Sequence, residues 1–368
     1  MWPLELVREG QHVMTVCNAC RYCEQYCPVF PAMERRLTFT AEDLGYLANL
    51  CHNCGECLYA CQYAPPHEFG IDVPRTLAAI RVRSYEEYCW PRALGGAFRR
   101  NSVASALALA AALIVFMFLA TWLGGGRLSA ANPQGDFYAV VPHAAMVALF
   151  GAVGLFVAIA IAIGVLRFWR DNHRDRRSST GSGDLARGLR DALTLRHLHG
   201  SGPDCTSNEE ERSPWRRYFH HATFYGFLLC FASTTVAAIY HSVFGWHAPY
   251  AYTSVPVLLG TAGGAGLVVG PAGLFALRRR RDPALAAPGY GGFDESFIVL
   301  LFLTSATGLA LLVLRDSALM GALLIVHLGF VLALFLTLPY GKFVHGFYRT
   351  AALVKHAVEG QGIISRDP

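Results

Sequence analysis

Charge is scarce in this chain, and its scarcity excludes the most common class of protein. Of 368 residues only 15% are Asp, Glu, Lys or Arg, whereas 54% are hydrophobic; an ordinary soluble chain has about 25% charged residues. The mean hydropathy of +0.34 also excludes a disordered chain. The composition therefore predicts a membrane protein with a smaller soluble part.

Two sequence signals are also missing. The first ten residues contain no basic segment followed by an apolar one, so no secretion signal is visible. We therefore expect its eleven cysteines, eight of which lie between Cys17 and Cys61, to be reduced thiolates in the cytoplasm. The chain also has no dinucleotide-binding fingerprint, so a flavin or nicotinamide cofactor is expected on another polypeptide.

Charged residues are nearly absent from six apolar segments, each long enough to cross a hydrocarbon core of about 30 Å. Residues 1–100 are mixed in polarity and form the predicted soluble domain, and residues 101–368 form the predicted membrane domain, with a cytoplasmic loop at 170–218. The expected spans are residues 103–123, 139–169, 219–244, 255–277, 296–314 and 319–338.

The few basic residues predict the orientation, because Lys and Arg are enriched in cytoplasmic loops. The only basic residues in the loops expected on the outer side are Arg127 and Arg315. We expect both termini and the cysteine-rich domain on the cytoplasmic side of the inner membrane, and we interpret the arginine run at 278–281 as a topology signal, with no nucleic-acid partner. The basic clusters on the other side are Arg99 and Arg100, Arg167 to Arg177, Arg216 and Arg217, Arg278 to Arg281, and Lys342 with Arg349.

The loop at 170–218 contains one amphipathic pattern. Leu185, Leu189 and Leu193 recur at helical spacing between arginines. We expect a short helix there that lies on the membrane surface or on a partner, and the sequence leaves both open.

The cysteines form two runs of identical spacing, C-x2-C-x2-C-x3-C. Three closely spaced cysteines hold one cuboidal cluster, and the fourth ligates the other cluster of a two-cluster module. Zinc would leave the third and fourth cysteines of each run unexplained. We therefore predict two [4Fe-4S] clusters. The ligands are Cys17, Cys20, Cys23 and Cys61 for cluster 1, and Cys51, Cys54, Cys57 and Cys27 for cluster 2.

The segment between the runs indicates the type of ferredoxin. Residues Thr40 to Asp43 resemble a capping box, and Leu44, Leu47 and Cys51 follow at helical spacing. This favours the helical two-cluster type, as in succinate dehydrogenase iron–sulfur subunits, over the strand-built type. The predicted fold is all-α: a helical di-[4Fe-4S] ferredoxin-like domain followed by a six-helix, cytochrome b-like membrane bundle.

Histidine is the main polar residue left in the membrane segments, where an ionisable side chain is expected to be functional. Paired imidazoles on membrane helices typically hold b-type haem, so one or two haems are predicted. The alternative is that the histidines only mark helix ends, which suits His327 least. The candidate ligands are His143, His220, His221, His241, His327 and His345.

Helical spacing predicts how these histidines pair. If residues 319–345 form one continuous helix, bent but not ended at Pro339, His327 and His345 share a face. Antiparallel packing of the third and sixth spans then places His220 or His221 opposite His345, and His241 opposite His327. His143 is an alternative ligand at the outer end.

Three segments together resemble one known family, that of the tricarballylate utilisation protein B, also called citrate utilisation protein B. They are residues 17–34 (CNACRYCEQYCPVFPAME), 61–69 (CQYAPPHEF) and 338–349 (LPYGKFVHGFYR). The cysteine spacing alone is shared with many redox proteins, whereas the tail that follows Cys61 and the last segment are far more specific. No proline follows Cys61 directly, which departs from the general ferredoxin pattern.

The resemblance implies a membrane partner of a flavin-dependent tricarballylate dehydrogenase, which oxidises tricarballylate to cis-aconitate. This chain would reoxidise the flavin and pass electrons through the clusters and b-type haem to the quinone pool. The alternatives are the same role for another flavoprotein, a citrate or tricarballylate carrier, or a redox sensor. A carrier is disfavoured because charged residues do not interrupt the spans, and a sensor has little use for membrane histidines.

Overall fold

The structure is a computed structural model that describes residues 2–99, 103–123, 135–173, 181–199, 205–208, 211–285 and 291–364. Arg100, Arg127, Arg174, Arg176 and Arg177, which entered the topology prediction, lie outside the described residues. Apart from one short two-stranded ribbon in the long loop, the described elements are helices, so the all-α prediction is confirmed for this part of the chain.

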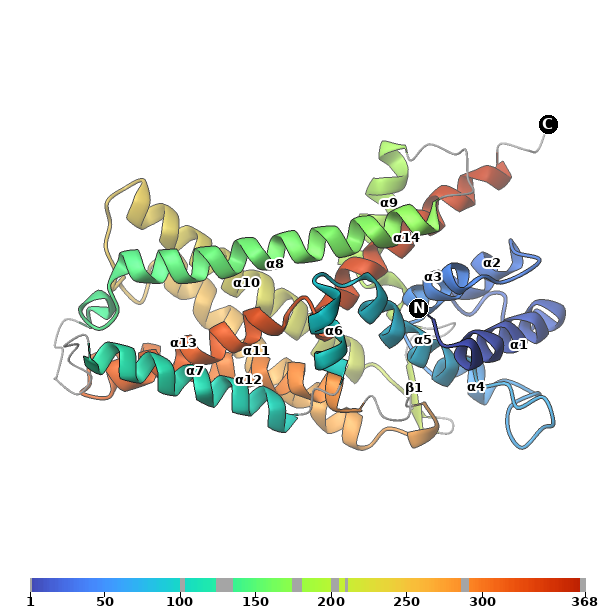
Figure 1. Cartoon of the computed structure of the whole chain (residues 1–368), viewed down its shortest axis with the longest axis horizontal. Coiled ribbons are helices and arrows are strands. Elements are labelled where there is room, and N and C mark those ends of the chain that lie inside the picture. The colour runs from blue at the N-terminus through green and yellow to red at the C-terminus, as the bar shows by residue number, and fades with distance from the viewer. Residues whose placement is uncertain are drawn as a thin grey trace.

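The cysteine-bearing N-terminal domain is a group of helices at one end of the molecule (Figure 1). Helix α3 begins at the predicted capping box, where the Thr40 hydroxyl accepts a hydrogen bond from the Asp43 N–H and the Asp43 carboxylate accepts one from the Thr40 N–H. The helices are α1 (Leu4–Cys20), α2 (Val29–Glu34), α3 (Ala41–Leu50), α4 (Glu56–Tyr59), α5 (Val73–Tyr88) and α6 (Arg92–Arg99).

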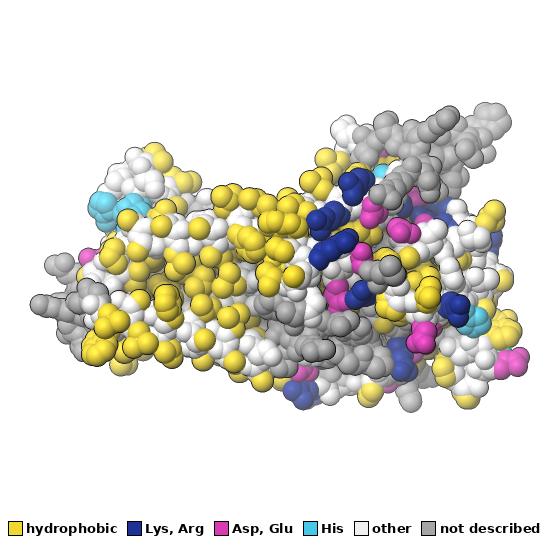
Figure 2. Space-filling view, in the orientation of Figure 1, with side chains coloured by type: hydrophobic (Ala, Val, Ile, Leu, Met, Phe, Trp, Pro, Cys, Tyr) yellow, Lys and Arg dark blue, Asp and Glu magenta, His cyan; other side chains and the backbone are white. Residues whose placement is uncertain are grey.

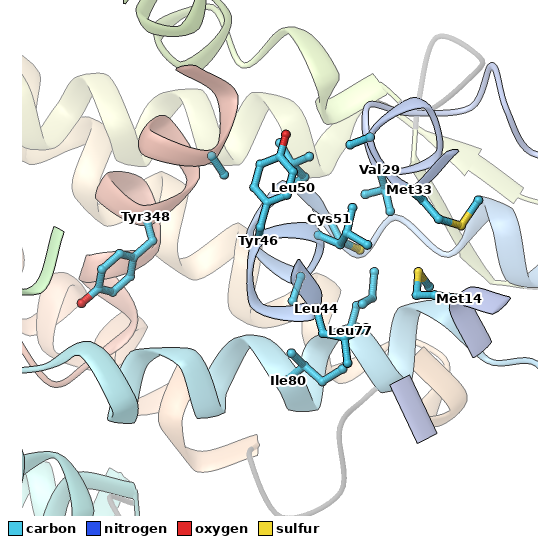
Figure 3. Close-up of a cluster of buried hydrophobic side chains, with 14 of the residues drawn as sticks. Met14, Val29, Met33, Leu44, Tyr46, Leu50, Cys51, Leu77, Ile80 and Tyr348 are labelled. Atoms are coloured by element: carbon cyan, nitrogen blue, oxygen red, sulfur yellow. The ribbon is translucent and has the colours of Figure 1, made fainter. Parts of the chain in front are cut away.

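This domain has a densely buried core. Leu44 and Leu47 of α3 are almost fully buried and pack with Met14 of α1 and with Leu77 and Ile80 of α5 (Figure 3). Burial of these side chains supplies the main stabilisation of the domain. It also fixes both ends of α3, and the second cysteine run starts at the end of that helix.

All six predicted spans are helices long and apolar enough to cross a membrane. They run along the long axis of the molecule (Figure 1), and their visible face is covered by hydrophobic side chains, whereas Lys, Arg, Asp and Glu gather beside the cysteine-bearing domain (Figure 2). The spans are α7 (Val103–Leu123), α8 (His143–Asn172), α10 (Trp215–Ser242), α11 (Val255–Arg279), α12 (Gly291–Val313) and α13 (Met320–Thr337).

The packing order of the spans differs from the one expected. Helix α10 packs on α11, α11 on α12, and α12 on α13, whose other side packs on α7. Helix α13 is the most buried of the six spans. The predicted antiparallel pairing of the third and sixth spans is therefore wrong, because α11 and α12 lie between α10 and α13.

Glycines in α11 explain why α10 packs closely against it. A Cβ atom on Gly266 would come within 2.9 Å of the Ala222 carbonyl oxygen, and one on Gly270 within 2.7 Å of the Thr223 nitrogen. Only glycine permits this close approach of two helix backbones. The glycine-rich stretch of the fourth span therefore serves helix packing.

The residues from His327 to His345 do not form one continuous helix. Helix α13 ends at Thr337, a 3-10 turn η4 covers Lys342–Val344, and α14 covers His345–Ile364. Pro339 lacks the backbone N–H that a continuing helix needs. The prediction that Pro339 bends the helix without ending it is therefore wrong.

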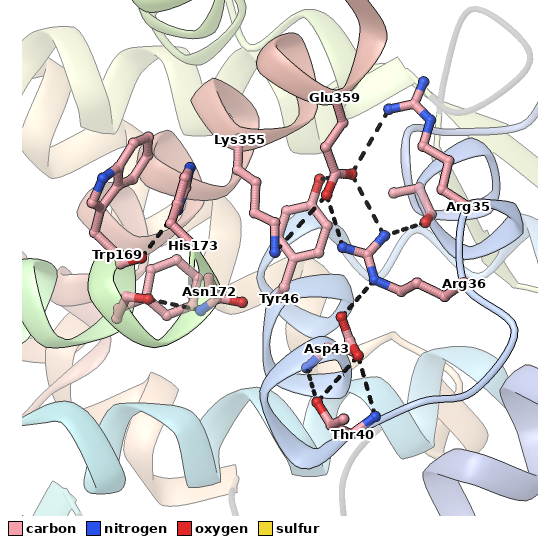
Figure 4. Close-up of polar contacts among 12 residues, drawn as sticks. Arg35, Arg36, Thr40, Asp43, Tyr46, Trp169, Asn172, His173, Lys355 and Glu359 are labelled. Atoms are coloured by element: carbon pink, nitrogen blue, oxygen red, sulfur yellow. Dashed lines mark hydrogen bonds and ion pairs between the residues drawn. The ribbon is translucent and has the colours of Figure 1, made fainter. Parts of the chain in front are cut away.

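Helix α14 returns to the cysteine-bearing domain and shares its hydrophobic core through Tyr348 and Ala352. Its far half is held by buried ion pairs (Figure 4). Glu359 is 2.9 Å from the Arg36 guanidinium and accepts a hydrogen bond from the Tyr46 hydroxyl. The last helix thereby fastens the cysteine-bearing domain to the membrane spans.

The long loop carries α9 (Ser182–Leu193), which confirms the predicted helix, then the 3-10 turn η2 (Arg196–His199) and the antiparallel ribbon of β1 (Cys205–Asn208) and β2 (Glu211–Ser213). Gly188 of α9 lies against Val354 of α14. Leu185, Leu189 and Leu193 remain exposed on another face of α9. Two more 3-10 turns, η1 (Phe137–Ala139) and η3 (Pro283–Leu285), precede α8 and follow α11.

Candidate functional site

The first cysteine run forms one wall of a cavity at the end of α1. Cys17 and Cys20 lie in the last turn of α1, where the left-handed backbone of Arg21 (φ 55°) turns the chain toward Cys23. Cys61 comes from the second run and lines the same cavity, which has a volume of about 220 Å³. The fold thus brings together the four cysteines predicted for cluster 1.

The second run encloses a smaller cavity nearer the membrane helices. Cys51 follows α3, Cys54 lies in the next loop and Cys57 lies in α4. Together with Cys27 from the first run they line a cavity of about 20 Å³. The fourth cysteine of each run therefore lies beside the first three of the other run.

The two cavities are immediate neighbours. Phe30, Cys57 and Val73 line both of them. Groups bound in the two cavities would be separated by a single layer of side chains. An electron passing between them would not have to cross solvent.

The donor atoms are of the type that iron–sulfur clusters require. Four cysteines of the predicted sets line each cavity, and cysteine thiolates are the ligands of [4Fe-4S] clusters. In the part of the chain that the structure describes, no three His, Cys, Asp or Glu side chains are placed to hold a single metal ion. The Asn53 N–H also donates to Cys51 Sγ at 3.3 Å, and hydrogen bonds to sulfur are one means by which proteins tune iron–sulfur clusters.

The protonation of these cysteines depends on a bound metal. Burial, followed by the neighbouring cysteines, raises the pKa of Cys17 and of Cys23 to about 12. Burial likewise raises the pKa of Cys27 and of Cys57 well above the usual value. Alone, the thiols would keep their protons, and they become ligands when positive metal charge replaces those protons. Iron in a cluster supplies such charge.

Three arginines from the membrane side hold the loop of the second cavity. Arg216, at the start of α10, donates to the carbonyl oxygens of Asn53 and His52, each at 2.9 Å. Arg281, just beyond α11, donates to the Asn53 carbonyl at 2.7 Å, and Arg349 of α14 lies 3.2 Å from His52 Nδ1. Burial, and then the nearby Arg349, lowers the pKa of His52, so its neutral ring accepts this hydrogen bond.

A histidine pair lies one helical turn from two of these arginines. His220 is four residues after Arg216 in α10, and His345 is four residues before Arg349 in α14. Their ring centroids are 6.0 Å apart at an interplanar angle of 82°. The predicted proximity of His220 to His345 is observed, although α10 and α13 do not pack together, because α14 brings His345 to α10. His221 instead contacts Tyr225.

The outer histidines meet in a different pairing from the one expected. His143 and His241 stack face to face with centroids 3.8 Å apart, and His247 Nδ1 lies 3.1 Å from His241 Nδ1. The stacked faces leave no space for a metal between them. The alternative partner His143 is therefore the one that lies beside His241.

His327 faces another helix. Its Nδ1 is 3.1 Å from the Thr304 carbonyl and 3.2 Å from the Thr307 hydroxyl, both in α12. A Cβ atom on Gly308 would come within 2.9 Å of its ring. The predicted pairing of His327 with His241 is therefore wrong, because His327 faces α12 and His241 stacks on His143.

Comparison with known proteins assigns both parts of the chain to one family. A family model described as citrate utilization protein B matches residues 98–363, and one described as its Fer4-like domain matches residues 10–87. A protein of Escherichia coli named citrate utilization protein B is 50% identical over 356 residues, which cover 95% of this chain and 92% of that protein. The chain belongs to the citrate utilization protein B family. No solved structure matches it.

Sequence reasoning missed how this family member joins its Fer4-like domain to its membrane domain. Arg216, Arg281 and Arg349 were interpreted as topology signals only. The four-residue spacing of Arg216 to His220 and of His345 to Arg349 was a usable signal, since residues four apart share a helix face. No sequence pattern pointed to His52 or Asn53 as their partners.

Proposed function

We propose that this citrate utilization protein B family member carries electrons from a reduced flavoprotein dehydrogenase, through two [4Fe-4S] clusters and b-type haem, to the quinone pool. When bound, these groups supply one-electron carriers. The observation that carries the proposal is a continuous chain of contacts. The two cysteine cavities adjoin, and Arg216 and Arg349 link the second cavity to the histidine pair one helical turn away.

His220 and His345 are the ligands we propose for haem. Their ring centroids lie 6.0 Å apart, and two imidazoles that face each other on neighbouring helices would hold a haem iron. His345 Nδ1 donates to the Lys342 carbonyl, which leaves Nε2 for the metal. His143 and His241 stack too closely for a metal between them, and His327 contacts Thr304 and Thr307, so these three histidines take no part in this proposal.

Electrons would enter at cluster 1. Cys20 is exposed, and Tyr22 beside it has 66% of its surface exposed. The cavity of cluster 2 is instead held by arginines of α10 and α14. A partner flavoprotein would therefore approach the end of α1.

The family name supports the proposed type of substrate, and the location of the histidines supports the proposed acceptor. The Escherichia coli relative is named for citrate utilization, and a flavin-dependent tricarballylate dehydrogenase is the partner that we propose here. Another flavoprotein donor is an outcome of the test. Quinone is proposed as acceptor because electrons that reach a site between membrane helices can leave on a lipid-soluble carrier. The basic clusters support an inner-membrane location with the cysteine-bearing domain in the cytoplasm.

The cofactor assignment can be tested on the purified full-length protein. We expect about eight iron atoms of cluster type per chain, four for each of two clusters, and a reducible haem spectrum. His345→Ala should remove the haem and keep the cluster iron, whereas His327→Ala should keep both. Protein with full cluster iron but no haem band would contradict the haem proposal. Haem loss in His327→Ala but not in His345→Ala would overturn the ligand assignment.

A further inference from the structure

Three arginines contact the loop that lines the second cysteine cavity. Arg349 lies 3.2 Å from Nδ1 of His52, which lines this cavity next to Cys51. Its charge also lowers the pKa of Cys27, although burial raises that pKa overall. Arg216 and Arg281 donate to the backbone carbonyls of the same loop. Among the described residues, none of these three arginines is within 4.0 Å of an Asp or Glu oxygen.

Burial of such a cation is costly unless a negative partner compensates it. Burial, followed by the nearby Arg81, lowers the pKa of Arg349 to about 10, and burial, followed by Arg216, lowers that of Arg281 to about 10. Both side chains still carry their charge at neutral pH. Cys51, Cys27 and Tyr85 raise the pKa of Arg349, and the two cysteines line the second cavity and would carry negative charge as cluster ligands.

In the described structure, none of these three arginines makes a hydrogen bond to a residue that lines the first cavity. Burial, other cysteines and Glu56 act on Cys23, and burial and cysteines act on Cys17; all raise the pKa. Glu56 also lines the second cavity, so its charge does not distinguish the two sites. The arginines do, because Arg216, Arg281 and Arg349 contact His52 and Asn53, which line the second cavity only.

We infer that Arg349, supported by Arg216 and Arg281, is the counter-charge of cluster 2 and holds the reduction potential of that cluster above that of cluster 1. This inference rests on the proposed cluster assignment. Reduction adds one electron, and therefore one negative charge, to the four-thiolate site, with no bond made or broken. A fixed cation beside that site stabilises the added charge. Arg349 thus makes electron transfer from cluster 1 to cluster 2 favourable. It does so through its charge and without binding the cluster.

The test is a potentiometric titration of the purified full-length protein, followed by electron paramagnetic resonance of the two clusters. Arg349→Gln should lower the midpoint potential of one cluster and leave the other unchanged, at unaltered iron content. Arg349→Lys should restore most of the potential, because it keeps the charge. The Cys20→Ser background, in which cluster 1 is expected to be lost, identifies the shifted cluster as cluster 2.

Arg278→Gln is the matched control, because Arg278 lies at the same end of α11 but pairs with Asp294 at 2.8 Å. It should shift neither potential. If Arg349→Gln loses iron, Arg281→Gln should give a smaller shift in the same direction. Unchanged potentials in iron-replete Arg349→Gln and Arg281→Gln would overturn the inference. A shift in Arg349→Lys as large as that in Arg349→Gln would also overturn it. Wild-type protein without clusters would contradict the proposed function instead.

Discussion

Cys27 and Cys61 are the two cysteines that lie beside the other run's cysteines. Each lies four residues after the third cysteine of its own run but lines the cavity of the other run. The spacing was sufficient to predict this exchange because a short loop cannot wrap one cluster with all four cysteines of one run. The positions of the arginines around Asn53 were not predictable, since the contacts join residues far apart in the sequence.

The cysteine assignment makes a prediction for single substitutions. Cys54→Ser should remove about half of the cluster iron, because the neighbouring four-cysteine site is complete without it. Cys89→Ser should leave the iron content unchanged, since Cys89 is buried outside both cavities and its side chain donates to the Glu86 carbonyl. Iron analysis and the spectrum of each variant check this. Equal iron in Cys54→Ser and wild type would contradict the assignment.

Helix α14 is the element that the sequence described least well. The apolar run predicted the sixth span, but the return of residues 345–364 onto the N-terminal domain depends on partners about 300 residues away, such as Arg36. Hydrophobic periodicity carries no information about such distant contacts. The six spans and α3 were predictable because their signals, apolar length and a capping box, are local.

The ion pairs of α14 predict its stability. Glu359 has a side chain only 1% exposed, and it faces Arg36 and Lys355. Glu359→Gln should lower the opening free energy of α14, measured by amide hydrogen exchange, by about 3 kcal/mol, because it leaves buried positive charge without its partner. Glu87→Gln, at the exposed pair with Arg92, should change local stability by about 1 kcal/mol or less. Equal protection of α14 in Glu359→Gln and wild type would show that apolar packing alone holds it.

Helix α9 has one neighbour that helps to locate it. The Tyr225 hydroxyl, inside the predicted third span, donates to the Leu193 carbonyl at 3.0 Å. This contact favours the membrane surface over a protein partner for the exposed leucines. A spin label at Leu189→Cys, in protein reconstituted into lipid, should be more accessible to oxygen than to a water-soluble nickel reagent. A label at Arg190→Cys should show the reverse order. Preferential nickel access at both positions would place α9 in solvent.

At the scale of the whole molecule, a series of contacts leads from the first cavity to the histidine pair. The exposed first cavity adjoins the second, the second is held by arginines, and two of those arginines lie one turn from His220 and His345. One hydrophobic core joins the cysteine-bearing domain to α8 and α14. A rigid junction of this kind keeps the distance between consecutive carriers constant, which a flexible linker would not.

The order of the carriers is the central claim, and anaerobic stopped-flow spectroscopy tests it most directly. Reduced flavoprotein dehydrogenase is mixed with the full-length protein in detergent while the haem α-band is followed. We expect haem reduction in wild type and in Cys89→Ser, and a large loss of its rate in Cys54→Ser, which retains the haem. Haem reduction at the wild-type rate in a Cys54→Ser protein that lacks cluster 2 would contradict the account.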